Sequence, residues 1–357
     1  MIRPPALLLG VPIADLGEAE TLGLIGDMVR DGRATGATHQ IATANVDFLV
    51  NALADERLRR ILQSADLCLA DGMGVKWGAA VVGMPIRERV AGADLFPLLV
   101  DASQHNGWRV HVFGSKPSTV RSAEALVRER LPRSSVTFDA GPQISDPTDV
   151  PEAVLDAIAA VDADILCVAL GNPKQELFID ANRERLGAPV MIGIGGSLDF
   201  FTGDRRRAPG WMQRTGTEWI ARMVQEPARL APRYARDLWV YTPRLAREWR
   251  VTQARRREAG ITVELEPAAV VARFDGRAAA PGPVEWQRAI DRISVGAELR
   301  VSPGSATAVA DPALACLVGL LQHARRQNAK VVWLDDPARL APLVRPFGIS
   351  VEFFTSP

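Results

Sequence analysis

The chain has 357 residues, which suggests about two domains, and 47% of them are hydrophobic, which is ample for packed cores. Its 42 basic and 42 acidic residues cancel, so no overall charge steers it toward a polyanion. The three cysteines are far apart, so we exclude a disulfide framework. No apolar run reaches the roughly 18 residues of a membrane span, so we exclude a membrane-spanning helix and expect a cytoplasmic protein.

Short apolar runs alternate with segments of helical apolar spacing through residue 200. Strands that alternate with helices predict an α/β fold, with a mostly parallel, Rossmann-like sheet covered by helices on both faces. The clearest helices are predicted at 118–131 and 174–186. The expected strands are 39–43, 67–70, 109–113, 136–139, 165–170 and 190–194.

Polar residues stand where the first of these strands ends. Thr43 and Asn45 place a hydroxyl and an amide side by side at the strand end, where they can hold sugar hydroxyls or a carboxylate. The alternative is a capping role for the helix that follows.

A carboxylate follows the next strand directly. The apolar run 67–70 changes abruptly into Asp71, Gly72, Met73 and Gly74, which indicates a strand, a tight turn and a helix start. Ligands bind at the carboxyl edge of open α/β sheets, so a catalytic carboxylate is the best interpretation of Asp71. An N-cap for the following helix explains the same residues equally well.

Two more polar turns are expected at this edge. Gly114 precedes Ser-Lys-Pro-Ser at a helix start, where backbone N–H groups can cradle a diphosphate, although the Gly-Lys-Ser/Thr ending of a Walker loop is missing. After strand 165–170, the residues Lys174, Gln175 and Glu176 occupy the first turn of a helix. Ligand binding and ordinary capping both remain open for this cluster.

Metal and dinucleotide chemistry are poorly supported. Asp162 and Asp164 form an Asp-x-Asp pair, but they precede their strand and so belong to the opposite edge of the sheet, and the four histidines lack metal spacing. Gly193, Gly195 and Gly196 lack the complete Gly-x-Gly-x-x-Gly spacing. We therefore predict no metal site and no bound cofactor, and we disfavour a nucleotide-dependent oxidoreductase.

Arginines and aromatic residues are concentrated between residues 205 and 257. This window holds fourteen arginines against four acidic residues, four of the eight tryptophans and both tyrosines. Its prolines at 227, 232 and 243 are expected to split it into short helices. We favour contact with a membrane surface, with arginines on anionic headgroups and aromatics at the interface, over a nucleic-acid patch or a helical pair packed on the core.

A second compact pattern follows residue 260, and roughly one hundred residues suffice for an independent domain. The elements expected there are strands 261–266 and 269–274, a helix at 284–293, a strand at 298–301, a helix at 312–326, a strand at 331–334, a helix at 337–344 and a strand at 351–354. The predicted division of the chain is 1–204 for the α/β domain, 205–258 for a basic aromatic helical appendage, and 261–357 for a smaller C-terminal α/β domain.

Taken together and in this order, the motifs resemble those of the WecG/TagA/CpsF family of bacterial glycosyltransferases (glycosyltransferase family 26). The resemblance extends from about Gly10 to Arg247, and the ordered succession of motifs carries it rather than any single one. The motifs are Thr43–Asn45, Asp71–Gly74, Glu88–Leu95, Val112–Gly114, Gly171–Glu176, Gly193–Phe200, Arg207–Pro209, Glu218–Trp219, Arg222 and Glu226–Leu230.

The resemblance implies inverting, metal-independent transfer of a hexose, of the N-acetylmannosamine or glucose type, from a UDP donor to a polyprenyl-diphosphate-linked glycan in cell-surface or exopolysaccharide synthesis. It places the protein peripherally on the inner face of the cell membrane, with no nucleic acid partner, and makes Asp71 the general base. With the turns above, the predicted substrate-binding residues are Thr43, Asn45, Arg89, Gln175, Gly114 and Lys174. The predicted acceptor and membrane contacts are Arg214, Arg222, Arg229 and Arg233.

The order of elements in 261–357 resembles a STAS domain, which implies docking to a protein partner. In regulatory STAS domains a phosphorylatable Ser or Thr follows the Asp ahead of the long helix, whereas here Pro312 follows Asp311. A docking or scaffold role is therefore expected rather than a phosphorylation switch. The alternative for the whole chain is a catalytically degenerate scaffold that presents this domain, and the intact set of predicted site residues argues against it.

Overall fold

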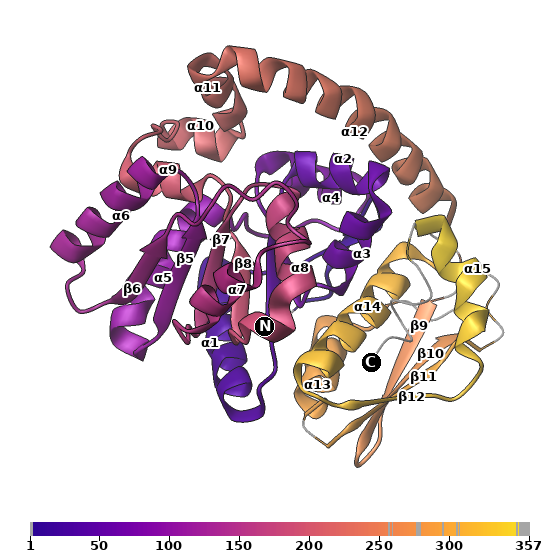
Figure 1. Cartoon of the computed structure of the whole chain (residues 1–357). Coiled ribbons are helices and arrows are strands. Elements are labelled where there is room, and N and C mark those ends of the chain that lie inside the picture. Colours follow the sequence, from indigo (N-terminus) through magenta and orange to yellow (C-terminus); the bar gives the residue numbers. More distant parts are fainter. Residues whose placement is uncertain are drawn as a thin grey trace.

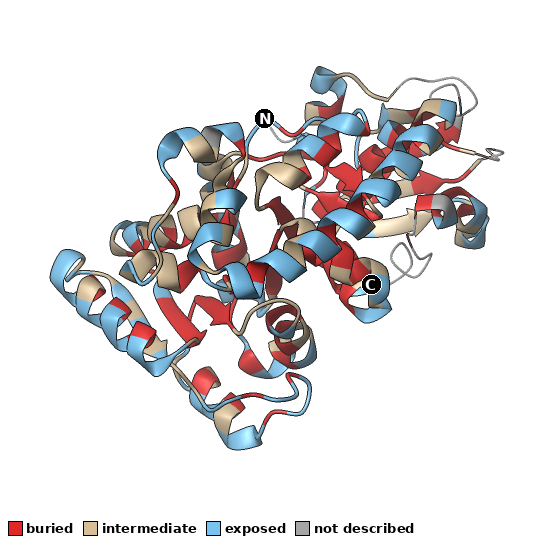
Figure 2. Cartoon of the chain, turned by 90° about the horizontal axis from the view of Figure 1, so that it is seen from above, coloured by how far each residue is buried: buried red, intermediate tan, exposed pale blue. Residues whose placement is uncertain are grey.

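The computed structural model describes residues 3–255, 258, 260–275, 280–294, 296–304, 306, 308–347 and 349, without the side chains at 214, 275 and 346. Figure 1 shows a helix-covered central sheet, a smaller sheet beside it and a long helix, α12, that arches from one to the other. Buried strands lie between helices whose outer faces are exposed (Figure 2).

The central sheet has six parallel strands in the order β4-β3-β8-β7-β5-β6. Inner strands such as β3 are buried along their whole length, whereas residues of the edge strand β6 alternate between exposed and half-buried, as expected for a sheet covered on both faces. All six strands predicted for this sheet are confirmed, with each end displaced by at most one residue. Their bounds are His39–Ala44 (β3), Leu67–Ala70 (β4), Arg109–Gly114 (β5), Ser135–Asp139 (β6), Ile165–Ala169 (β7) and Val190–Gly193 (β8).

Helices cover both faces of this sheet, so the fold is α/β and Rossmann-like. One face packs against α1 (Glu18–Thr35), α5 (Gly92–Asn106) and α6 (Pro117–Arg130) through a shared apolar core. The other face packs against α2 (Val46–Ala54), α3 (Glu56–Ser64), α4 (Met73–Val81), α7 (Glu152–Ala159) and α8 (Lys174–Leu186).

A short antiparallel hairpin, β1 (Ala6–Leu8) and β2 (Val11–Ile13), precedes the sheet and was not predicted. Its second strand continues into a bridge between Ala14 and Leu69 of β4. Both strands are fully buried, so the N-terminal residues belong to the body of the molecule.

After α9 (Ser197–Thr202) the appendage forms α10 (Gly210–Thr215), α11 (Glu218–Gln225) and the 29-residue helix α12 (Pro227–Arg255). The expectation that prolines split this segment into short helices is wrong for Pro232 and Pro243, which lie inside α12. Both are exposed, so water can bond the carbonyl groups that lose their helical partner. No helix in the described ranges is long and apolar enough to cross a membrane.

The C-terminal part forms a four-stranded sheet in the order β12-β11-β10-β9, antiparallel between β9 and β10 and otherwise parallel. The strands β9 (Gly260–Leu265), β10 (Ala269–Asp275), β11 (Glu298–Ser302) and β12 (Lys330–Trp333) share a core with the helices. The helices are α13 (Pro283–Arg292), α14 (Asp311–Arg326) and α15 (Ala341–Val344), with 3-10 turns at Pro337–Leu340 and Arg345–Phe347. The strand expected at 351–354 lies outside the described residues.

Helix α14 packs this C-terminal sheet against the body of the molecule. Leu7 of the hairpin is 1% exposed and belongs to the C-terminal core. Near the C-terminal end of α14, the Arg326 Nη1 atom donates to the carbonyl oxygen of Asp66 at 2.8 Å, and the Gln322 amide donates to the Ala65 carbonyl at 3.3 Å. The two sheets are thus joined by packing as well as by α12.

Candidate functional site

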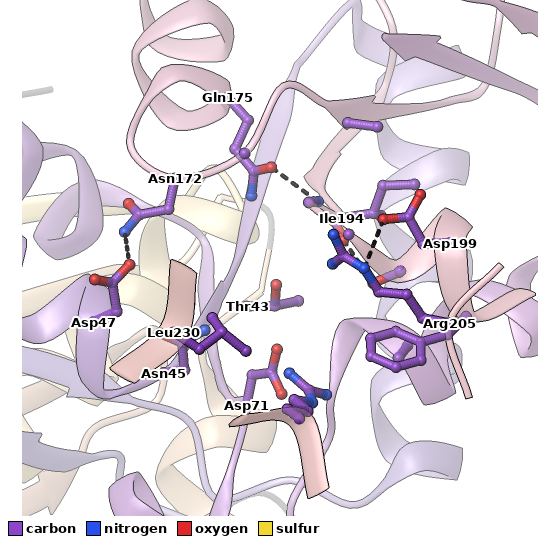
Figure 3. Close-up of a pocket in the computed structure, with 18 of the residues that line it drawn as sticks. Thr43, Asn45, Asp47, Asp71, Asn172, Gln175, Ile194, Asp199, Arg205 and Leu230 are labelled. Carbon is purple, nitrogen blue, oxygen red and sulfur yellow. Dashed lines mark hydrogen bonds and ion pairs between the residues drawn. The ribbon is translucent and has the colours of Figure 1, made fainter. Parts of the chain in front are cut away.

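A pocket of about 420 Å³ lies at the carboxyl ends of the central strands (Figure 3). Thr43, Asp71 and Gln175 approach it from β3, β4 and the start of α8, while α11 and α12 form its roof. The pocket occupies the sheet edge at which the sequence predicted a ligand site.

Asp71 lines this pocket and does not cap a helix. Helix α4 has Gly72 as its N-cap residue, with no side-chain capping bond, so the capping alternative for Asp71 is wrong. Gly72 has φ = 116°, a conformation that side-chain-bearing residues rarely adopt. Burial raises the pKa of the Asp71 carboxyl, and the nearby guanidinium groups of Arg222 and Arg89 offset part of that rise.

Thr43 and Asn45 both line the pocket. The Thr43 hydroxyl donates to the Gly193 carbonyl oxygen at 3.0 Å and so joins β3 to β8. Asn45 caps α2, because its Oδ1 atom accepts from the Phe48 backbone N–H at 3.3 Å. For Asn45 the capping role is therefore present alongside its exposure to the pocket.

The turn after β7 divides its polar residues between the pocket and the interior. The Gln175 Oε1 atom accepts from the Gly195 N–H at 2.9 Å and lines the pocket. Lys174 points away, with its Nζ atom donating to the Ile144 carbonyl at 2.9 Å, so the pocket wall does not include this predicted residue. Gly114 is also outside the wall, although the next two residues, Ser115 and Lys116, line it.

Glu176 is completely buried behind Gln175. Its Oε1 atom accepts from the Gln175 amide at 2.9 Å, while its Oε2 atom has no hydrogen-bond partner in the described part of the chain. Burial raises the pKa of this carboxyl to about 8. A side chain at Gly193 would meet both groups at 2.4 Å, so this glycine is what lets them pack against β8.

Arg89 stands beside the pocket rather than in its wall, in a cluster of ion pairs beneath the roof. It lies 2.9 Å from Asp94 and 3.8 Å from Glu218. Arg207 contacts Asp94, and Arg222 lies 2.8 Å from Glu218. This cluster fastens α11 to the first turn of α5.

Three of the four predicted acceptor arginines line the roof. The Arg222 guanidinium stacks over the Phe200 ring at 4.7 Å, Arg229 pairs with Glu226, and the Nε atom of Arg233 lies 3.2 Å from Asp47. The side chain of Arg214 lies outside the described residues.

Several polar residues of the wall were not predicted as site residues, and four of them form contacts with one another. Asp47 and Asn172 are joined by a hydrogen bond of 3.0 Å, and the Arg205 Nε atom lies 3.3 Å from an Asp199 oxygen (Figure 3). Asp47 could have been found, because it follows Asn45 by two residues at the same edge. Arg205 could not, because only the fold returns its loop to the pocket.

Comparison of the whole sequence identifies the relatives of this chain. The sequence model of the glycosyl transferase WecG/TagA/CpsF family matches residues 6–255. The chain belongs to this glycosyl transferase family. The match covers the central sheet and the appendage and ends with α12, and the C-terminal sheet lies beyond it.

Two members of the family from Bacillus are similar over most of their length. The chain is 34% identical over 189 residues to the N-acetylglucosaminyldiphosphoundecaprenol N-acetyl-beta-D-mannosaminyltransferase of Bacillus spizizenii W23. The aligned region covers 53% of this chain and 72% of the relative. The protein of the same name from Bacillus subtilis 168 is 31% identical over 189 residues, with the same coverage.

Proposed function

We propose that this glycosyl transferase moves a hexose, of the N-acetylmannosamine or glucose type, from a UDP donor to a polyprenyl-diphosphate-linked glycan, with inversion and without a metal. The observation that carries the proposal is Asp71, a carboxylate of raised pKa in a pocket whose roof is lined with arginines. The names of the two Bacillus relatives, which specify a diphosphoundecaprenol-linked acceptor, support the choice of acceptor.

Asp71 is the general base of the proposed reaction. Its carboxylate takes the proton of the acceptor hydroxyl while that oxygen attacks the anomeric carbon. The bond between this carbon and the UDP oxygen breaks, and its electron pair leaves with the diphosphate. Because attack and departure occur on opposite faces of the sugar, one such step inverts the anomeric configuration.

Positive charge for the two diphosphates comes from the pocket wall. Arg222 and Arg229 in the roof, with Lys116 ahead of the N-terminus of α6, line the space beside Asp71. Fixed cations of this kind stabilise the charge that develops on a leaving diphosphate. Thr43, Asn45 and Gln175, which line the same pocket, bind sugar hydroxyls in this proposal.

The outer surface of the appendage faces the membrane in this proposal. Trp239 is 84% exposed, Val224 73% and Trp211 58%, and Arg247 and Arg250 of α12 are exposed as well. Aromatic side chains settle at the lipid interface, and each basic side chain near anionic lipid contributes about 1 kcal/mol. We place the protein on the inner face of the cytoplasmic membrane, where its lipid-linked acceptor lies.

For the C-terminal part we propose a STAS-like docking role toward a protein partner. The sheet of four strands flanked by α13 and α14 supports this comparison. Asp311, the first residue of the long helix α14, is buried and accepts a hydrogen bond from Thr252 of α12. It therefore serves a contact within the chain.

The test of the catalytic proposal is Asp71→Asn, assayed by mass for sugar transfer from UDP donors to a polyprenyl-diphosphate-linked N-acetylglucosamine acceptor. We expect transfer to fall at least a hundredfold, with UDP affinity and thermal stability retained, and EDTA to leave the wild-type rate unchanged. Transfer within a few fold of wild type would remove Asp71 from the role of base. A wild-type chain that transfers no sugar would favour the scaffold alternative.

The membrane proposal is tested separately by flotation with anionic liposomes. Trp239→Ser combined with Arg247→Glu and Arg250→Glu should abolish flotation, because these residues are on the outer surface. Arg229→Ala is the matched control, since it lines the pocket and should reduce transfer without affecting flotation. Equal flotation of the triple variant and wild type would contradict the proposed membrane face.

A further inference from the structure

Asp47 is a buried carboxylate that joins three walls of the pocket. It lies in the first turn of α2 and is 7% exposed. Its Oδ1 atom accepts from Arg236 Nη2 at 2.7 Å and lies 3.2 Å from Arg233 Nε, both on α12. Its Oδ2 atom accepts from the Asn172 amide at 3.0 Å, in the turn between β7 and α8 (Figure 3).

The charges around Asp47 indicate that its partners are protein groups rather than a ligand. Both carboxylate oxygens are already engaged, and a free negative charge in this wall would repel a diphosphate. A buried carboxylate is stable only when it is paired, and a pair that loses one partner is costly. Asp47 and the two α12 arginines therefore hold one another in place.

The three elements that meet at Asp47 also carry predicted binding residues. Helix α2 follows Asn45, the turn after β7 leads to Gln175, and α12 carries Arg233 into the roof. The contacts of Asp47 thus connect the α12 part of the roof to the floor of the pocket.

We propose that Asp47 is a positioning residue for the lipid-linked diphosphate acceptor. By binding Arg233 and Arg236 it fixes the first turns of α12 over the pocket and directs Arg233 toward the acceptor diphosphate. This inference rests on the proposed function of the pocket. It adds a residue that acts through the arginines without touching substrate.

The experiment compares Asp47→Ala and Asp47→Asn with Asn51→Ala in the full chain. Asn51 is the matched control, because its Oδ1 atom accepts from the same Arg236 group at 2.9 Å but lies outside the pocket wall. We expect Asp47→Ala to raise the acceptor KM tenfold or more, with UDP affinity by calorimetry within twofold of wild type. Asn51→Ala should change either value less than threefold.

A second readout needs no substrate and therefore separates this inference from the proposed function. In hydrogen–deuterium exchange, Asp47→Ala should increase exchange in residues 227–237 at least fivefold, and Asp47→Asn should give a smaller increase because its amide oxygen still accepts from Arg236. Should Asp47→Ala fail to fold, Arg236→Gln loosens the same contact from the other partner and should give the same exchange and KM pattern.

Three results would overturn the inference. One is unchanged exchange in residues 227–237 together with a rise in acceptor KM, because Asp47 would then contact the substrate itself. Another is a loss of UDP affinity equal to the loss of acceptor affinity. The last is additivity of Asp47→Ala and Arg233→Ala in acceptor KM, since a residue that acts through Arg233 has no effect once Arg233 is gone.

Discussion

The position and the pKa of the Asp71 carboxyl group are determined by its neighbours along the chain and across the pocket. Gly72 turns the chain just after β4 and is the N-cap residue of α4, which has no side-chain capping bond. Arg222 and Arg89 favour the ionised carboxylate, while burial favours the protonated form. The balance of these effects predicts how the reaction depends on pH.

We expect kcat/KM to fall at acid pH with a midpoint above about 3.9, the value of an ordinary aspartate. The base must be ionised, so activity is retained above its pKa and lost as pH falls through it. Arg222→Gln removes a charge that lowers the pKa, so the acid limb should move to higher pH, whereas Arg222→Lys should leave it in place. A limb that stays fixed in both variants would mean that Arg222 acts on substrate alone.

The sequence predicted which residues reach the sheet edge that holds the pocket. It predicted less well where their side chains point. Asp71 and Thr43 directly follow or end parallel strands, whose carboxyl ends meet at one edge. Lys174 and Gln175 are neighbours on a helix, where successive side chains diverge by about 100°, and only Gln175 faces the pocket. The contacts of Asp47 with α12 depend on a tertiary approach that no local pattern records.

Helix α12 is fastened to the body by an aromatic residue at its middle. The Tyr241 hydroxyl donates to the Gly74 carbonyl oxygen at 3.0 Å, in the helix that follows Asp71. Tyr241 is 6% exposed and reaches this position because residue 78 lacks a side chain: a Cβ there would lie 2.0 Å from the hydroxyl.

We therefore expect Gly78→Ala to displace Tyr241 and lower the free energy of unfolding by about 1–3 kcal/mol, the usual cost of overpacking. Gly23→Ala is the control, because Gly23 lies in helix α1 with nothing within 4 Å of the added methyl group. That change should be neutral or stabilise by up to about 1 kcal/mol through helix propensity. Urea denaturation measures both, and equal effects would contradict the contact.

At the level of elements, short apolar runs predicted the central strands, because parallel strands that are covered on both faces are apolar along their length. It failed where context overrode a local signal. Pro232 and Pro243 do not end α12, since their exposed side tolerates a lost bond. The hairpin at residues 6–13 was missed because each strand has only three residues, too few to show alternation.

The amino-terminal edge of the central sheet connects the two parts of the molecule through His39. Its ring lies 3.1 Å from Asp31 of α1 and 3.1 Å from Asp66, whose carbonyl oxygen accepts from Arg326 of α14. Burial alone would lower the His39 pKa, but the hydrogen bonds to Asp66 and Asp31 outweigh it and raise that pKa. The protonated ring therefore stabilises the folded chain.

Stability from a raised histidine pKa is complete below the unfolded value, about 6.5, and is lost as pH rises through the folded value. We expect the free energy of unfolding of the wild type to decline as pH rises across this window. In His39→Gln this decline should be absent. At lower pH the variant should be less stable than wild type by roughly 1.5–3 kcal/mol for each charge-assisted hydrogen bond that is lost. His111 is the control: burial lowers its pKa, so its contribution has the opposite sign. An unaltered slope in His39→Gln would contradict this account.

The three-residue strand β1 contributes side chains to both parts of the molecule. Successive side chains of a strand point to opposite sides, so Ala6 and Leu8 enter the core of the family domain while Leu7, between them, enters the core of the C-terminal sheet. The spatial border between the two units therefore passes through Leu7, near the start of the chain and about 250 positions from the border along the sequence. A fragment that begins at residue 260 would lack Leu7, a side chain of its own core. Transfer of the C-terminal unit to a relative would therefore require transfer of the hairpin as well.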